Sequence, residues 1–338
     1  MGAPSKKIGL QVKSMGFTQN NEYFNPAGDG YTLFGYWLDL RLRMQLAASD
    51  RTSFAFGGII EDSFDEEGLK RLSPAFTLKH REGPWTLTFG NLETVVNRHG
   101  LTDVWVAFEK PIRDPVEQGL ELHRRDESSL FNLWVDWQQS TLPGMSRAER
   151  FWLGGVGELS MQGSSGWRLD GLVRVSGVHE GGQNLASSPG VLTQLNGAPG
   201  VRFLAGHSGE LQDGCGVEAF AHFSRSSGRL TRAGHALELN AYFGDFHMDD
   251  RAGTRFSAVY FNSLGFESPL GGDLYQNYSR RFGSEGDPLP RRELLFLRIE
   301  SRLKWLDAFE LFFRFEPYID LRSRRIEHAE ALRLSFQW

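Results

Sequence analysis

The sequence predicts an all-β fold: one transmembrane antiparallel up-and-down β-barrel of about sixteen strands (14–18) spanning residues 1–338. Three observations predict it. Apolar and polar residues alternate with a period of two over long segments, which indicates strands with two unlike faces. The connecting segments alternate between short and long. Aromatic residues stand at the ends of the apolar faces, as an interfacial girdle would place them.

Composition restricts the class of protein. The chain has 338 residues, 40% of them hydrophobic, and a net charge of −5, so no overall basic field points to nucleic acid. The single cysteine, Cys215, excludes an intramolecular disulfide framework. No run approaches 18 consecutive apolar residues, so no transmembrane helix is predicted. A membrane barrel is compatible with this composition, because only alternate residues face lipid.

The segment from Thr32 to Leu46 shows the alternation most clearly. One face carries Phe34, Tyr36, Leu38, Leu40, Leu42, Met44 and Leu46, and the other carries Leu33, Gly35, Trp37, Asp39, Arg41, Arg43 and Gln45. Similar splits follow in the segments that begin near residues 131, 167, 293 and 309. These strands run to ~12–15 residues, longer than the ~5–6 of globular sheets and suited to tilted membrane strands.

Aromatic residues mark the ends of these apolar faces. They are Trp137, Trp167, Trp305 and Trp338. Tryptophan is enriched at both membrane–water interfaces. The placement favours lipid outside the barrel over an apolar core between two soluble sheets.

The connections give an independent test. The predicted strands are 6–17, 31–47, 51–62, 74–81, 85–93, 117–124, 129–139, 148–162, 166–179, 200–206, 214–224, 235–245, 254–263, 292–305, 308–320 and 325–338. The linkers at 18–30, 94–117, 180–199 and 263–291 are long, whereas those at 48–50, 82–84, 125–128, 163–165 and 306–307 are short; 207–213 and 246–253 are less tight. Short turns therefore gather at one end, as they do at the periplasmic end of membrane barrels.

The N-terminal residues bear on localisation. Residues 1–7 are polar and do not form an export signal, so a membrane barrel requires that a signal peptide is removed upstream of Met1. Without such a signal, the alternative is a soluble all-β protein that binds or acts on carbohydrate.

The last strand carries a resemblance to a known class. It ends Ala331-Leu-Arg-Leu-Ser-Phe-Gln-Trp338, with Leu334, Phe336 and Trp338 on one face. This ending resembles the C-terminal signal by which Gram-negative outer-membrane β-barrels are recognised for assembly, with Trp in place of the usual Phe. The resemblance implies an outer-membrane location with periplasmic termini. It also implies contact with outer-membrane lipids, with lipopolysaccharide and with the barrel-assembly machinery.

Length and strand number further resemble the sixteen-stranded porins, without a family-specific motif. In porins the loop between the fifth and sixth strands narrows the lumen. Here that position is held by Val95–Glu117, which contains Asp103, Glu109, Asp114 and Glu117 as the expected constriction-loop residues but is unusually apolar at 104–108. The resemblance implies a porin-like channel for small polar or charged solutes and a homotrimer. Polysaccharide-export barrels with Arg-rich lumens resemble the chain about as well, and an exporter could be a monomer.

Charged residues on the inward faces are the expected pore lining. They are Arg41, Arg43, Asp136, Arg168, Asp170, Arg174, Arg298, Glu300, Arg302, Lys304, Arg314 and Glu316. An acidic loop opposite Arg41 and Arg43 would create a transverse field that selects small solutes. The alternative is a salt-bridged wall that only stiffens the barrel.

Catalysis and metal binding have little support in the sequence. The histidines are scattered, no G-x-S-x-G elbow occurs, and His328 and Glu330 share the lipid-facing parity at the outer end of the last strand. The acidic turn of Asp245, His247, Asp249 and Asp250 is more typical of an exposed turn than of a calcium site. The expectation is therefore that the protein is not an enzyme, takes no metal or cofactor, and binds no nucleic acid.

Overall fold

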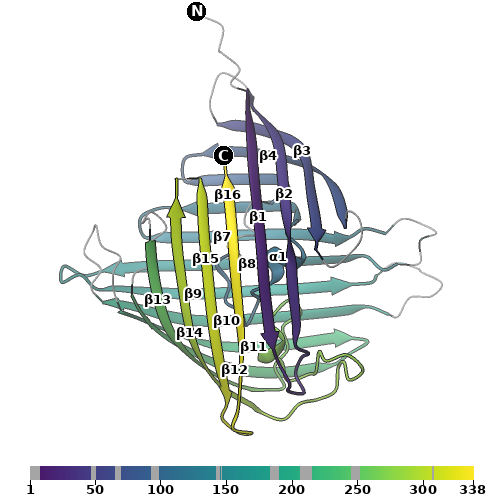
Figure 1. Cartoon of the computed structure of the whole chain (residues 1–338), viewed down its shortest axis with the longest axis vertical. Helices are drawn as coiled ribbons and strands as arrows, with labels where there is room; N and C mark the ends of the chain where they lie inside the picture. The colour runs from purple at the N-terminus through teal and green to yellow at the C-terminus, as the bar shows by residue number, and fades with distance from the viewer. Residues whose placement is uncertain are drawn as a thin grey trace, which may run out of the picture.

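The computed structural model describes residues 8–46, 51–64, 70–92, 99–141, 145, 147–182, 190–205, 215–244, 252–306 and 308–338. Within them sixteen strands form one closed antiparallel barrel in sequence order, which β1 and β16 complete by pairing with each other. Figure 1 shows β14, β15, β16 and β1 side by side, with β7–β12 crossing behind them as the opposite wall. The predicted sixteen-strand barrel is confirmed.

The strands are long and nearly all follow the predicted segments. Their bounds are β1 Ile8–Glu22, β2 Tyr31–Leu46, β3 Thr52–Ser63, β4 Arg71–Glu82, β5 Trp85–Asn91, β6 Gln118–Arg125, β7 Ser129–Gln139, β8 Arg150–Gln162, β9 Arg168–Glu180, β10 Leu192–Ala205, β11 Cys215–Gly228, β12 Arg232–Phe243, β13 Ala252–Leu264, β14 Arg292–Trp305, β15 Phe309–Asp320 and β16 Arg325–Gln337. A short helix α1, Lys110–Arg113, and a 3₁₀ turn η2, Asp273–Tyr275, lie in the two longest connections. No helix among the described residues is long and apolar enough to cross a membrane.

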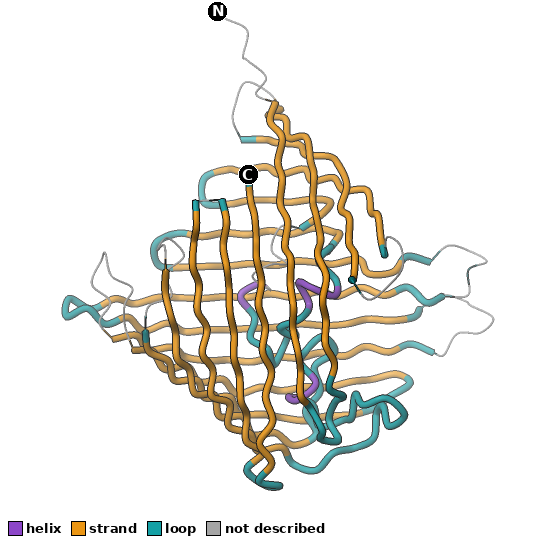
Figure 2. Tube along the Cα trace, in the orientation of Figure 1, coloured by secondary structure: helices purple, strands orange, loops and turns teal. Residues whose placement is uncertain are grey.

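The two ends of the barrel differ. β1 begins and β16 ends at the end of the barrel where the connections are short, for example at 83–84 and 126–128. The longest connections, 92–117 and 265–291, lie at the other end. Figure 2 shows these loops in teal. Because periplasmic turns are short and outer loops long, the long-loop end is the extracellular one. The predicted turns at 48–50, 207–213 and 246–253 lie wholly or largely outside the described residues.

The outer surface is apolar. On β2, Leu40 and Leu42 are exposed on one face, whereas Trp37 and Arg41 are buried on the other. The same parity leaves Leu332 and Leu334 of β16 exposed, with Leu334 opposite Gly16 of β1. Large apolar side chains turned outward around a closed sheet match a lipid-facing band. The girdle candidates Trp137, Trp167, Trp305 and Trp338 are exposed as well.

The lumen differs from the expected water-filled passage. Both long outer loops fold inward. They meet at a β-bridge between Val106 and Leu270. Their apolar residues join inward side chains of the wall in one buried cluster that includes Trp105, Trp134, Trp152, Phe220, Phe261, Phe266, Tyr275 and Phe296. The loop apolarity at 104–108 thus serves packing inside the barrel, where these residues escape water.

Two strands extend well beyond their predicted bounds. β10 begins at Leu192 rather than near residue 200, and β1 continues to Glu22 rather than residue 17. Alternate residues of both extensions, such as Gln19 and Asn21 in β1 and Gln194 and Asn196 in β10, are polar and turn into the barrel, where they are buried. Polar residues on the inward face weaken the period-two contrast, and proline is rare inside sheets, so the sequence pattern did not predict these strand ends.

Gly154 of β8 provides a test of the packed interior. A Cβ atom at Gly154 would lie 2.1 Å from the Trp134 ring, whereas Gly157 on the same strand has no atom within 4 Å. Gly154→Val is expected to destabilise the barrel by about 1–3 kcal/mol through overpacking. Gly157→Val is the matched control. Urea unfolding of both variants in detergent micelles measures the difference, and equal midpoints would contradict a packed lumen.

Candidate functional site

Ion pairs tie the first inward loop to the barrel wall. The Asp103 carboxylate accepts hydrogen bonds from Arg298 at 2.7 Å and from Arg314 at 2.5 Å. Glu316 bonds both arginines as well. Asp103 is almost fully buried, so this four-residue group is a closed structural network rather than a free charge at a constriction.

A second buried group holds the other end of the same loop. Glu117 Oε2 lies 2.6 Å from His99 Nε2, and Glu117 Oε1 lies 3.1 Å from Lys110 Nζ. The His99 ring stacks on Trp134 with centroids 4.0 Å apart. The His99 and Glu117 side chains are 0% and 1% exposed. We call His99, Lys110 and Glu117 the loop latch.

The environment of the latch shifts its pKa values in opposite directions. Burial alone would lower the pKa of His99, but its hydrogen bonds to Glu117 and Glu121 outweigh burial and raise it. Burial would raise the pKa of Glu117, but its bonds to His99 and Lys110 outweigh burial and lower it. The charged forms of both groups are therefore favoured inside the barrel.

A second buried histidine pair lies on the wall. His222 Nε2 is 3.0 Å from the Glu238 carboxylate, and Trp105 donates its indole N–H to His222 Nδ1 at 3.0 Å. His222 is fully buried. Both nitrogens of the ring are thus engaged, which leaves no position for a reacting water.

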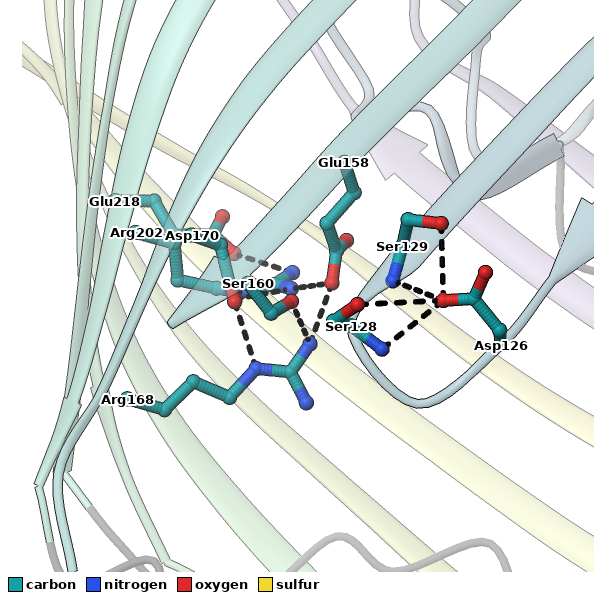
Figure 3. A network of polar contacts seen from close by, with 9 residues as sticks. All are labelled: Asp126, Ser128, Ser129, Glu158, Ser160, Arg168, Asp170, Arg202 and Glu218. Carbon is teal, nitrogen blue, oxygen red and sulfur yellow. Dashed lines mark hydrogen bonds and ion pairs between the residues drawn. The ribbon is translucent and has the colours of Figure 1, made fainter. Parts of the chain in front are cut away.

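The remaining predicted lumen residues are also engaged in contacts. Arg41 makes two 2.7 Å bonds to Asp39, and Asp136 accepts the backbone N–H of Gln118. In Figure 3, Arg168 and Arg202 clamp Asp170 and Glu158 at 2.6–2.7 Å. Such pairing is typical of a stiffening wall.

Each of the other predicted residues has its place. Arg174 lies over the Phe220 ring. Glu300 forms an ion pair with Arg314, and Arg302 forms one with Glu310. Arg43 and Lys304 are half-buried on the inward parity. Among the constriction-loop residues, Glu109 accepts the Tyr31 hydroxyl at 2.5 Å, and Asp114 pairs with Lys110. Their role in permeation stays a prediction.

A different polar group lies on the outside of the barrel. On the lipid-facing parity of β16, β1 and β2, the outer ends carry Asn20, Glu22, Thr32, His328 and Glu330, which we call the outer cluster. Asn20 stands opposite Glu330 on β16 and opposite Thr32 on β2, while Glu22 stands opposite His328. Strand pairing alone therefore joins residues that lie about three hundred positions apart in the chain.

Hydrogen bonds connect the outer cluster. His328 Nε2 lies 3.2 Å from Glu330 Oε2, and Asn20 Nδ2 donates to Glu330 at 3.2 Å and to Glu22 at 2.8 Å. Thr32 donates to the Asn20 side-chain oxygen at 2.9 Å. The His328 and Glu330 side chains are 42% and 40% exposed. Among the described residues, the His99–Glu117 and His222–Glu238 pairs are buried, whereas the His328–Glu330 pair is exposed on the outer surface.

Apolar side chains flank the outer cluster. Phe315 on β15 stands opposite Glu330, and Phe34 on β2 lies two residues from Thr32 on the same face. On β16 itself the next outward residue toward the membrane is the exposed Leu332. The cluster is thus a polar island at the extracellular border of the apolar outer surface.

Among the described residues no group of three or more metal-binding side chains is assembled. The acidic turn of Asp245, His247, Asp249 and Asp250 lies outside the described residues.

Comparison with known proteins identifies the family. A family model described as lipid A 3'-O-deacylase-type matches residues 2–338. The chain belongs to this family. It is accordingly an outer-membrane protein, as the predicted location had it. No curated protein matches this deacylase-type chain.

Solved structures share the fold of this deacylase-type barrel. A loop L8 deletion mutant of OmpT from Vibrio cholerae is 8% identical, with a TM-score of 0.55 over 99% of this chain and 100% of that one. The anion-selective porin of Comamonas acidovorans gives 8% and 0.54 over 99% and 100%. OmpF of Salmonella typhi gives 10% and 0.53 over 100% and 99%. At these identities the likeness shows a porin-like fold.

The expectation that the protein is not an enzyme is wrong, because the family is one of lipid A 3'-O-deacylases. The G-x-S-x-G motif that the chain lacks belongs to soluble hydrolases, which place the reacting group on a strand-to-helix turn. A barrel can bring reacting groups together across neighbouring strands instead. One feature of the sequence did indicate this site: the polar residues His328 and Glu330 share the face of the last strand that is otherwise apolar.

The loop latch predicts a pH dependence. The stabilisation from His99 is fully present below its ordinary pKa of 6.5 and is lost as pH rises through the raised value. The stabilisation from Glu117 is present above 4.5 and is lost as pH falls through the lowered value. Hydrogen-exchange protection of residues 99–117 should therefore be greatest between about pH 4.5 and 6.5.

Removing the acid of the latch should abolish the loss of protection at low pH and weaken the loss at high pH, because Glu121 still contacts His99. Glu117→Gln is expected to lower the local opening free energy by about 3 kcal/mol, because two buried cations lose their partner. Glu109→Gln is the control, because this acid of the same loop bonds Tyr31 and no member of the latch. Unchanged protection in Glu117→Gln would show that the latch does not hold the loop.

Proposed function

We propose that the protein is an outer-membrane hydrolase that removes an ester-linked acyl chain from a lipid of the outer leaflet, with the outer cluster as its active site. The observation that carries the proposal is the exposed His328–Glu330 pair on the lipid-facing parity, at the level where lipid esters lie. Family membership supports the reaction class, and lipid A, named in the family description, is the substrate we favour.

The arrangement fits general-base catalysis. Glu330 Oε2 lies 3.2 Å from His328 Nε2 and so favours the tautomer with its proton on that nitrogen, which leaves the Nδ1 lone pair free to take a proton. Asn20 donates to Glu330 and so fixes its orientation. His328 is thereby the base, Glu330 its orienting partner and Asn20 the residue that positions both.

The proposed reaction conserves atoms and charge. Nδ1 of His328 removes a proton from water as the water oxygen attacks the ester carbonyl carbon. The tetrahedral intermediate collapses when the bond between that carbon and the sugar oxygen breaks. The proton held by His328 passes to the sugar oxygen, which leaves a free fatty acid and a sugar hydroxyl.

Burial argues against the other two histidine pairs as the base. His99 and His222 are buried inside the barrel; the His99 ring stacks on Trp134, and both ring nitrogens of His222 are engaged by Trp105 and Glu238. A lipid ester would have to cross the barrel wall to reach them. The outer cluster needs no such movement, since its groups already face the membrane border.

His328→Asn tests the base. Loss of a positioned general base typically costs 10²–10⁴ in rate, so hydrolysis should fall by at least about a hundredfold. The measurement is mass spectrometry of fatty acid released from vesicles containing lipid A by the detergent-folded protein. His179→Asn is the control, because His179 lies on the opposite wall and bonds Thr193 rather than a carboxylate. Equal loss in both variants, or none in either, would refute the role of His328.

A diffusion channel for small polar solutes is the second candidate, favoured by the porin-like fold and by the charged inner wall. The inward loops argue against an open passage, because their apolar residues are buried against the wall. An exporter of a large polysaccharide would need still more space.

Planar-bilayer recordings separate the two candidates. The inserted, folded protein is expected to give no steady ohmic steps, or steps at least about tenfold smaller than those of a sixteen-stranded porin recorded in parallel, because conduction needs a continuous wet path. Porin-sized steps would restore the channel as the main function.

A further inference from the structure

The turn between β15 and β16 concentrates positive charge directly above the outer cluster. Arg322, Arg324 and Arg325 lie within four successive positions, and all three are exposed. The Asp320 side chain accepts the backbone N–H groups of Arg322 and Ser323, so it shapes the turn rather than pairing with a guanidinium group. Across the described part of the chain, no carboxylate lies within 4.0 Å of these three guanidinium groups.

This pattern differs from the rest of the barrel. Arg168, Arg202, Arg298 and Arg314 each bind carboxylates of the protein itself. Like charges at neighbouring turn positions repel one another, and nothing in the turn offsets this repulsion. Three arginines left without acids therefore indicate an anionic partner outside the chain.

The acids around the turn already have donors. Asp29 pairs with Arg281, and Glu327 accepts hydrogen bonds from Asn25 and from Tyr318. Glu22 accepts from Asn20 within the outer cluster. These neutral donors leave the charges of Glu22 and Glu327 in place but bind both carboxylates, and neither lies within 4.0 Å of the three guanidinium groups.

Exposed apolar side chains adjoin the arginines. Arg325 Nη1 donates to the Phe24 carbonyl at 3.1 Å, and the Phe24 ring is 69% exposed. Ile326, next in the chain, is 70% exposed. Cationic groups beside exposed apolar groups suit an amphiphile with an anionic head group.

We propose that Arg322, Arg324 and Arg325 form a subsite for a phosphate group on the head of the lipid substrate. The inference rests on the proposed hydrolase function and adds the specificity determinant for its substrate. Guanidinium groups bind phosphate through paired N–H donors, which gives orientation as well as affinity. Arg325 precedes His328 by three residues, about 10 Å along a strand and on the opposite face of β16, whereas Arg322 and Arg324 stand in the turn beyond the end of the strand. A sugar ring and an arginine side chain together span that separation, so a bound phosphate would direct a nearby ester toward His328.

The test uses the full detergent-folded chain with Arg322, Arg324 and Arg325 all changed to Gln. The substrates are lipid A vesicles and otherwise identical vesicles of enzymatically dephosphorylated lipid A. For phosphorylated lipid A, KM should rise about tenfold or more while kcat stays within about twofold, since each basic residue near a phosphate adds to binding. For the dephosphorylated lipid the triple variant and the unchanged protein should be equal. Arg229→Gln is the control, because this outer-end arginine is already paired with Glu180.

Equilibrium binding to the same vesicles separates this inference from the hydrolase proposal. His328→Asn protein should bind phosphorylated vesicles as the unchanged protein does, and the added triple substitution should weaken that binding about tenfold. That result supports the subsite even if no hydrolysis is found. Equal binding to both lipids, an equal loss on both lipids, or a fall in kcat with unchanged KM would overturn it. Displacement of the vesicles by micromolar inorganic phosphate would also overturn it, because the ligand would then be the free ion.

Discussion

The pairing of β1 with β16 is the constraint on which the rest of this structure depends. Inside a bilayer no water is available to backbone N–H and C=O groups, so a sheet must close on itself and leave no free edge. The register of that closing pair also decides which residues from the two ends of the chain become neighbours. Asn20 meets Glu330 and Glu22 meets His328 because β1 and β16 close in this register. Closure and the proposed active site are therefore consequences of the same contacts.

The interior of the barrel is organised by charge pairing around an apolar centre. Asp103, Arg298, Arg314 and Glu316 neutralise one another at one side of the inward loop, and the loop latch does so at the other. Between them, the loop and the wall bury large aromatic side chains. Buried ion pairs stabilise little by themselves, but an unpaired member would be costly, so they fix the loop in one position. A filled lumen also sets this deacylase-type barrel apart from the open passage that its porin-like strand order suggests.

The chemistry of the outer surface changes along the barrel axis. Toward the extracellular end, the exposed apolar band is followed by the outer cluster and then by the β15–β16 turn with its three exposed arginines. An amphiphile in the outer leaflet has the same order of chemistry, from chains through ester to charged head group. A lipid aligned by the membrane itself therefore needs little further positioning to bring its ester close to His328.

The sequence by itself determined the fold class, the strand number and the direction of most side chains, because the period-two pattern depends only on neighbouring residues and on the contrast between lipid and interior. It also placed His328 and Glu330 on the outward face, and the apolar residues near Trp105 in a loop of unusual character. It did not predict the polar ends of β1 and β10, the filled lumen or the outer cluster. Those depend on contacts between residues far apart in the chain, such as Asn20 with Glu330 and Glu117 with His99. Only closure of the barrel and inward folding of the loops decide such contacts, since side-chain patterns report which face a residue takes and not which partner it meets.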